Sequence, residues 1–179
     1  MTDKTSKTII EKFGFKDEEL TTPEHDKIML WTYKNWMKTI KQKLKKEILQ
    51  ELINNQTSKN EEEDKKNSEL VEKALNNIPP HYTLELEKPI LNNKFNIGFI
   101  DASVFLDFTI LTNHTRKRIN FEIKPIIKSI GETIRQIQFY KSHDFGEWII
   151  ITKTKGLKQL FKEQNIEIYE ITEEELKEV

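Results

Sequence analysis

Apolar residues in the first third of the chain recur every three or four positions, from Trp31 to Leu52. This spacing places them on one face of a helix, with polar residues on the other face. The segment 22–24 reads Thr-Pro-Glu, which supplies a capping hydroxyl, a proline suited to the first helical position and an early acid. The pattern predicts a long amphipathic helix to about residue 54, which packs against the rest of the chain or against a second copy.

The next segment, residues 55–68, contains no apolar side chain and alternates blocks of acids with blocks of lysine. Such a segment cannot contribute to a core, so we interpret it as a linker or as the tip of a helical hairpin. Residues 69–75 then predict a short helix, which ends before the proline pair at 79–80.

From residue 82 onward the pattern changes to that of strands. Residues 82–87 alternate until Pro89, residues 95–111 form a long apolar stretch, and residues 118–124 form a third strand. Three consecutive strands predict an antiparallel meander, with residues 114–117 as a basic hairpin turn.

The last third of the chain alternates helices with strands. A capping box at Ser129 and isoleucines at helical spacing predict a helix to Lys141. Residues 148–152 are continuously apolar, as in a strand buried on both faces. A helix at 157–161 and a strand at 166–169 complete the order, which predicts an α/β fold with a mixed sheet flanked by helices.

The amino-acid composition limits the size of the core, the kinds of metal ligand and the location that we expect for this chain. Hydrophobic residues make up 36% of the chain and charged residues 33%, so we expect a solvated extension beside one compact core. The chain has no cysteine, and any metal would therefore be held by oxygen or imidazole. No apolar stretch reaches the roughly 20 residues of a membrane span, and residues 1–11 lack a signal-peptide centre. These features predict a soluble, cytoplasmic protein without a membrane partner.

Three charged residues occupy apolar strands where propensity gives them no reason to be. Glu122 and Lys124 are two apart and so point to the same face, and Asp101 lies in an equally apolar run. If the strands are hairpin neighbours, both acids converge on one point, which suits Mg²⁺ with its preference for oxygen ligands. The alternative is a buried salt bridge between Lys124 and one acid, with the other acid at a strand end.

In their context, these residues resemble the motif of the PD-(D/E)XK nuclease superfamily, most closely its RecB-like and Holliday-junction-resolvase-like branches. The resemblance covers residues 68–152 and implies a restriction-endonuclease-like fold. It also implies that Asp101 and Glu122 bind Mg²⁺ or Mn²⁺ and that Lys124 is catalytic. The chain would then divide into a helical extension with a charged linker at 1–66 and a nuclease-like domain at 67–179.

Further residues follow from the same resemblance. Gln136 and Tyr140 match the branch motif QxxxY, whose positions brace the active site or touch DNA. Some members add a helix acid to the metal site, for which Glu69 and Glu72 are both candidates. Arg135 either reaches a phosphate or pairs with the acid three residues before it.

The sequence therefore predicts a metal-dependent endo- or exodeoxyribonuclease with DNA as its partner. One alternative is a catalytically weak DNA-binding or scaffold protein that keeps the nuclease fold. This alternative is motivated by the long N-terminal helix, which resembles a partner surface and through which we also expect a homodimer. Another is a nuclease acting on RNA. The basic residues 116–118 either contact phosphates or form a charged turn. The histidines lack paired ligand spacing and are expected to be surface or capping residues: His25, His81, His114 and His143.

Overall fold

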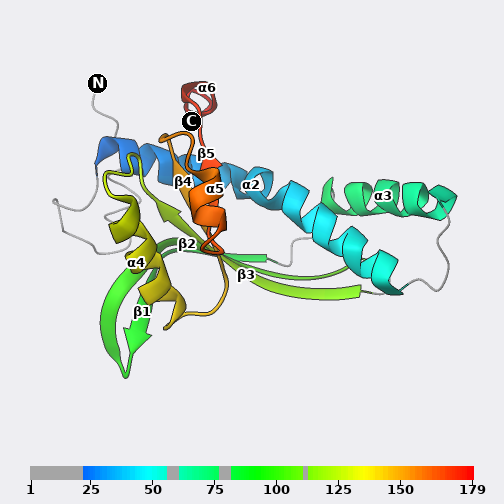
Figure 1. Ribbon diagram of the computed structural model, residues 1–179, viewed down its shortest axis with the longest axis horizontal. Helices are drawn as coiled ribbons and strands as arrows, with labels where there is room; N and C mark the ends of the chain where they lie inside the picture. The colour runs from blue at the N-terminus through cyan, green and yellow to red at the C-terminus, as the bar shows by residue number, and fades with distance from the viewer. Residues whose placement is uncertain (1–21, 56–60, 77–81, 111–112) are drawn as a thin grey trace.

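The computed structural model describes residues 22–55, 61–76, 82–110 and 113–179 (Figure 1). The elements follow one another in this order: α2 (Pro23–Asn55), α3 (Glu61–Asn76), β1 (Tyr82–Asn92), β2 (Phe95–Ile110), β3 (Asn113–Ile123), α4 (Ile130–Lys141), β4 (Glu147–Thr152), α5 (Lys158–Lys162), β5 (Glu167–Glu170) and α6 (Glu173–Leu176). The proline pair at residues 79–80, before which the predicted short helix ends, lies outside the described residues.

The five strands form one mixed sheet in the order β1-β2-β3-β4-β5. The first three strands pair antiparallel, while β4 and β5 add in parallel after helical crossovers. This arrangement confirms the predicted α/β class, the meander and the mixed sheet. None of the helices within the described ranges is long and apolar enough to cross a membrane.

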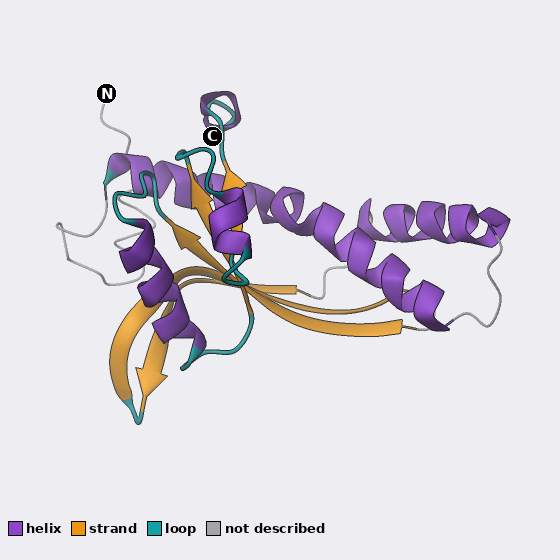
Figure 2. Ribbon diagram, viewed as in Figure 1, coloured by secondary structure: helices purple, strands orange, loops and turns teal. Residues whose placement is uncertain are grey.

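Helices cover both faces of the sheet (Figure 2). Alternate residues of the central strands pack against the helices on opposite sides of the sheet, because successive side chains of a strand point to opposite faces. Phe121 and Ile123 pack with α2, whereas Trp148 and Ile150 pack with α4 and α5. The sheet is therefore the middle layer of three.

The long helix α2 belongs to the core of the sheet. Its apolar stripe, which includes Trp31, Ile40 and Leu44, is buried against β2, β3 and β4. Trp31 stacks on Tyr169 of β5 with ring centroids 5.4 Å apart. The predicted boundary at residue 66 thus runs through a shared core, and the stripe that motivated a homodimer surface is already buried within the chain.

Several element bounds differ from those predicted. β1 continues through Pro89, which is tolerated because β1 is an edge strand. β3 begins at Asn113, so residues 114–117 pair with β2 instead of forming a turn. α3 begins at Glu61, inside the expected linker, where acids precede lysines by four residues as helices favour. The helix α6 was not predicted, although its Thr172 capping box is visible in the sequence.

Burial of α2 predicts a large difference between two aromatic residues on that helix. Trp31 is 0% exposed and Tyr33 is 51% exposed. Trp31→Ala should lower the free energy of unfolding by about 3–5 kcal/mol because it leaves a cavity. Tyr33→Ala, the matched control, should change it by less than about 0.5–1 kcal/mol. Urea unfolding followed by circular dichroism measures both, and equal losses would mean that α2 is not part of the core.

Candidate active site

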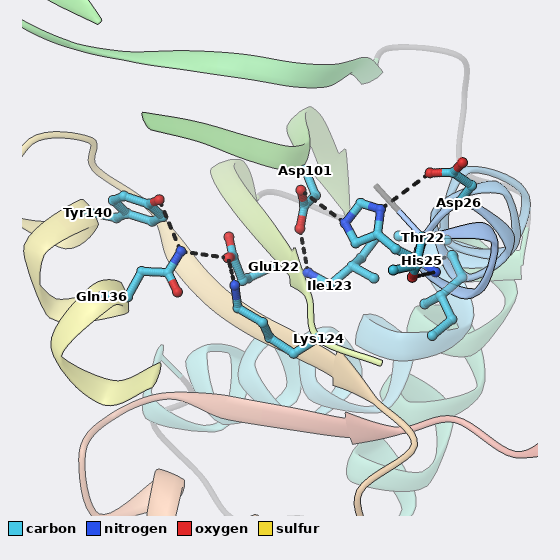
Figure 3. Close-up of polar contacts among 11 residues, drawn as sticks. Thr22, His25, Asp26, Asp101, Glu122, Ile123, Lys124, Gln136 and Tyr140 are labelled. Atoms are coloured by element: carbon cyan, nitrogen blue, oxygen red, sulfur yellow. Dashed lines mark hydrogen bonds and ion pairs between the residues drawn. The ribbon is translucent and has the colours of Figure 1, made fainter. Parts of the chain in front are cut away.

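A cavity of about 610 Å³ lies between the first turn of α2, the middle of β2, the C-terminal end of β3 and α4. Five residues predicted from the sequence line it: Asp101, Glu122, Lys124, Gln136 and Tyr140. Figure 3 shows the Asp101 carboxylate between Glu122 on one side and a histidine of α2 on the other. The structure therefore gathers the predicted acids and the lysine around one space.

Strand register explains why the acids meet. Ala102 of β2 pairs with Phe121 of β3, which places Asp101 and Glu122 at the same level of neighbouring strands. Around Asp101 the strand changes its packing: Ile100 contacts the layer of α4 and α5, whereas Ala102, two residues later, contacts the layer of α2. An undisturbed strand would send both to one face. Asp101 thus lies at the point where the side chains of β2 change from packing against α4 and α5 to packing against α2.

A third acid, Glu87 of β1, lies beside Asp101. Glu87 is flanked by residues that pair on either side of Asp101, and it also lines the cavity. Its φ is 49°, a conformation that non-glycine residues rarely adopt within a strand. Burial and the Asp101 carboxylate raise the pKa of Glu87. Glu87 was not predicted from the sequence, in which its one signal is that it is an acid at the end of an alternating strand.

Glu122 is the most deeply buried charged group of the cavity, with 3% exposure. Its Oε1 lies 2.9 Å from Lys124 Nζ and accepts a 3.0 Å hydrogen bond from Gln136 Nε2. Its Oε2 is buried and has no hydrogen-bond partner among the described residues. Burial raises the pKa of Glu122 to about 8, Asp101 adds to this effect, and Lys124 opposes it. Therefore Oε1 of Glu122 has partners, whereas Oε2 has no hydrogen-bond partner among the described residues.

Lys124 remains charged at this position. Burial lowers the pKa of Lys124, but the carboxylates of Glu122 and then Asp101 outweigh burial, and the net pKa is raised. The contact between Lys124 and Glu122 that the salt-bridge alternative expected is thus present. Asp101, however, lies within β2 and lines the same cavity, whereas that alternative expected an unrelated acid at a strand end.

Asp101 connects the sheet to α2. Its Oδ2 accepts a 2.6 Å hydrogen bond from the Ile123 amide, and its Oδ1 lies 3.4 Å from His25 Nε2. The His25 amide donates to Thr22 Oγ1 at 3.2 Å, which places His25 in the first turn of the helix. Burial opposes the charged form of His25, but Asp101 and Asp26 raise its pKa overall. The prediction of a surface or capping role for His25 was wrong, because sequence spacing does not reveal which helix meets the cavity.

Gln136 and Tyr140 form one connected pair on α4. Gln136 Nε2 donates to Glu122 and, at 3.0 Å, also to Tyr140 Oη. The Tyr140 ring lies against the backbone of Gly98, where an added Cβ would come within 2.9 Å of the ring. Ser129 caps the helix as predicted, accepting from the Glu132 amide. The glycine therefore leaves the room that Tyr140 needs beside Gln136.

Two candidate residues lie elsewhere. Glu72 is on α3 and pairs with Lys45 at 2.6 Å, and Arg135 is exposed on α4. Neither lines the cavity. The basic residues 116–118 are paired within the chain: Arg116 with Asp107, Lys117 with Glu47 and Glu147, and Arg118 with Asp144.

Among the residues that the structure describes, no group of three or more His, Asp or Glu side chains is arranged to hold a metal ion. Comparison of the chain with protein-family models, curated proteins and solved structures gave no match. The chemistry of this cavity must therefore be argued from its own residues.

The raised pKa of Glu122 has a measurable consequence in the metal-free protein. Between pH values of about 4 and 8 the Glu122 carboxyl is protonated in the folded protein but ionised in the unfolded protein. The free energy of unfolding therefore falls as pH rises through this range, because the folded state binds the extra proton. Glu122→Gln removes this loss. The stability of the variant relative to wild type should rise between pH 5 and 8, by at most about 1.4 kcal/mol for each pH unit.

Urea unfolding in EDTA at several pH values measures this difference. Glu163→Gln, which removes an exposed carboxylate, is the control and should show no such trend. Parallel stability curves for wild type and Glu122→Gln would mean that Glu122 ionises at an ordinary pH.

Proposed function

We propose that this protein is a metal-dependent nuclease that hydrolyses DNA phosphodiester bonds on a restriction-endonuclease-like fold. The observation that carries the proposal is the buried Glu122 Oε2, which has no hydrogen-bond partner among the described residues. An unsatisfied carboxylate oxygen costs free energy, and a bound cation is one way to recover that cost. The same cavity supplies a second acid and a cationic side chain.

The donor set suits Mg²⁺ or Mn²⁺. Mg²⁺ keeps several waters and commonly takes only one or two protein carboxylates together with substrate phosphate. Asp101 and Glu122 can supply these two, since each carboxylate oxygen has lone pairs beyond those already engaged. A group of three protein ligands is not required. His25 faces Asp101 through Nε2 and Asp26 through Nδ1, so it would orient the Asp101 carboxylate beside the metal ion.

Each residue of the cavity then has a definite task. When bound, the metal ion would lower the pKa of a coordinated water and polarise the phosphate. Lys124 stays charged beside Glu122 and can stabilise negative charge that develops on the phosphate oxygens. Gln136 fixes the Glu122 carboxylate, and Tyr140 fixes Gln136. Lys128, an exposed lysine on the cavity wall, can contact the DNA backbone.

A DNA-binding or scaffold protein with little catalysis is the second candidate. It is favoured by the Lys124–Glu122 ion pair, which partly neutralises the site without any cation. The two candidates differ in what Lys124 does: in a nuclease it acts on the reacting phosphate, whereas in a scaffold it only balances a buried acid. RNA is the alternative polymer.

Cleavage assays separate these candidates. Labelled duplex, single-stranded and branched DNA, with RNA in parallel, should be tested with Mg²⁺ or Mn²⁺. We expect wild type to cut DNA, excess EDTA to stop cleavage, and Lys124→Ala to lower kcat by about 10²–10³-fold. Lys158→Ala, which removes a lysine that is 66% exposed outside the cavity, is the matched control.

Calorimetry with Mn²⁺ tests the metal site independently of cleavage. Binding by wild type should be lost in Asp101→Asn. Cleavage that persists in EDTA would refute the metal-dependent mechanism. DNA binding that persists in Lys124→Ala, without cleavage by either protein, would favour the scaffold.

A further inference from the structure

The turn of the β1–β2 hairpin exposes two large apolar side chains. Phe95 is 76% exposed and Leu91 is 56% exposed. Figure 1 shows this hairpin curving under α4 so that its turn projects beyond the helix. Leu91 pairs with Asn96 and Phe95 pairs with Asn92, so the two side chains point to opposite faces of the hairpin and only Phe95 directly flanks the turn. Exposed apolar side chains are common singly, but Phe95 stands at the projecting end of a strand that also forms part of the cavity wall.

The hairpin tip is held in a defined position. Asn93 and Lys94 have φ values of 47° and 77°, which fits a two-residue type I′ turn matched to the twist of the strands. Below the turn, Ile90 and Ile100 are buried against the layer of α4 and α5. The tip is therefore a fixed projection.

The chemistry of the tip suits a nucleotide. Residues 89–97 read PILNNKFNI, with one lysine, three asparagines and no acid. A flat aromatic ring can stack on a base, amides can hydrogen-bond base edges, and an ammonium can approach a phosphate. The absence of carboxylates from this segment removes the repulsion that would oppose a phosphate backbone.

The same hairpin lines the candidate active site. Gly98 and Phe99 form part of the cavity wall, and Phe95 is three residues from Gly98 along β2. At about 3.3 Å per strand residue, the tip lies roughly 10 Å from that wall. Asp101, where the proposed reaction occurs, is three residues beyond Gly98 along β2, so it lies up to roughly 20 Å from Phe95. Stacked nucleotides advance about 3.4 Å each, so this separation corresponds to at most about six nucleotides.

We propose that Phe95 is a pin that stacks on an unpaired base, so that the enzyme selects DNA with a junction between single and double strand. This inference rests on the proposed nuclease function and names its substrate class. It places the cut within about six nucleotides of the junction.

Binding measurements test the pin without cleavage. Fluorescence anisotropy in Ca²⁺ compares a forked duplex with a blunt duplex of the same sequence. Phe95→Ala should weaken binding to the fork by roughly five- to hundred-fold, the effect of losing one base stack, and leave the blunt duplex unchanged. Phe95→Trp should restore binding. Leu160→Ala, which removes another exposed apolar residue (48% exposed) from α5, is the control.

Cleavage mapping on the fork in Mg²⁺ gives the second readout, with a cut expected within about six nucleotides of the junction. If wild type cuts DNA but Phe95→Ala binds the fork as tightly as wild type, the pin is wrong and the nuclease stands. If wild type neither binds nor cuts any DNA, both proposals fall. A smaller particle mass for Phe95→Ala by light scattering, with DNA binding unchanged, would assign the tip to contact with a second copy and overturn the pin.

Discussion

The candidate site depends on burying the Glu122 carboxylate in the middle layer of the fold. Burying a charge is costly unless it is paired and hydrogen-bonded, and an apolar residue of similar size would often stabilise a core more. Lys124 and Gln136 satisfy one carboxylate oxygen and leave Oε2 without a partner among the described residues. Packing alone does not account for such an arrangement. A strongly raised pKa in a cavity lined by a second acid is instead typical of functional sites.

The three layers supply different parts of the site, and no single layer suffices. α2 contributes His25 on one side of the sheet, α4 contributes Gln136 on the other side, and β3 carries Glu122 between them. Asp101 can face the α2 side and still line the cavity with Glu122 because β2 changes its packing at that residue. The same change occurs on β1 at Glu87, where the backbone adopts a positive φ. Backbone strain of this kind often accompanies function, and here it coincides with the level at which three acids lie on adjacent strands.

Sequence patterns predicted the parts of this structure that depend on local chemistry. Acids on apolar strands identified Asp101 and Glu122, and helical spacing placed Gln136 and Tyr140 on one face of α4. The patterns did not predict features that depend on which elements pack together in the folded chain. His25 lies 76 residues before Asp101, and nothing in its own segment says that the first turn of α2 meets β2. Pro89 ended the predicted first strand because a proline disfavours central strands, and only the sheet order reveals that β1 is an edge.

Gly98 links the hairpin to the carboxylate chemistry. Without a Cβ, its backbone lets the Tyr140 ring pack against β2, and Tyr140 accepts a hydrogen bond from the same Gln136 nitrogen that donates to Glu122. The Tyr140 ring thus connects the backbone of β2 at Gly98 with the hydrogen bond that orients the Glu122 carboxylate. Because close-packed interiors transmit displacement, a shift of the hairpin would move Tyr140 and Gln136. It would thereby alter the hydrogen bond that Gln136 donates to Glu122 Oε1.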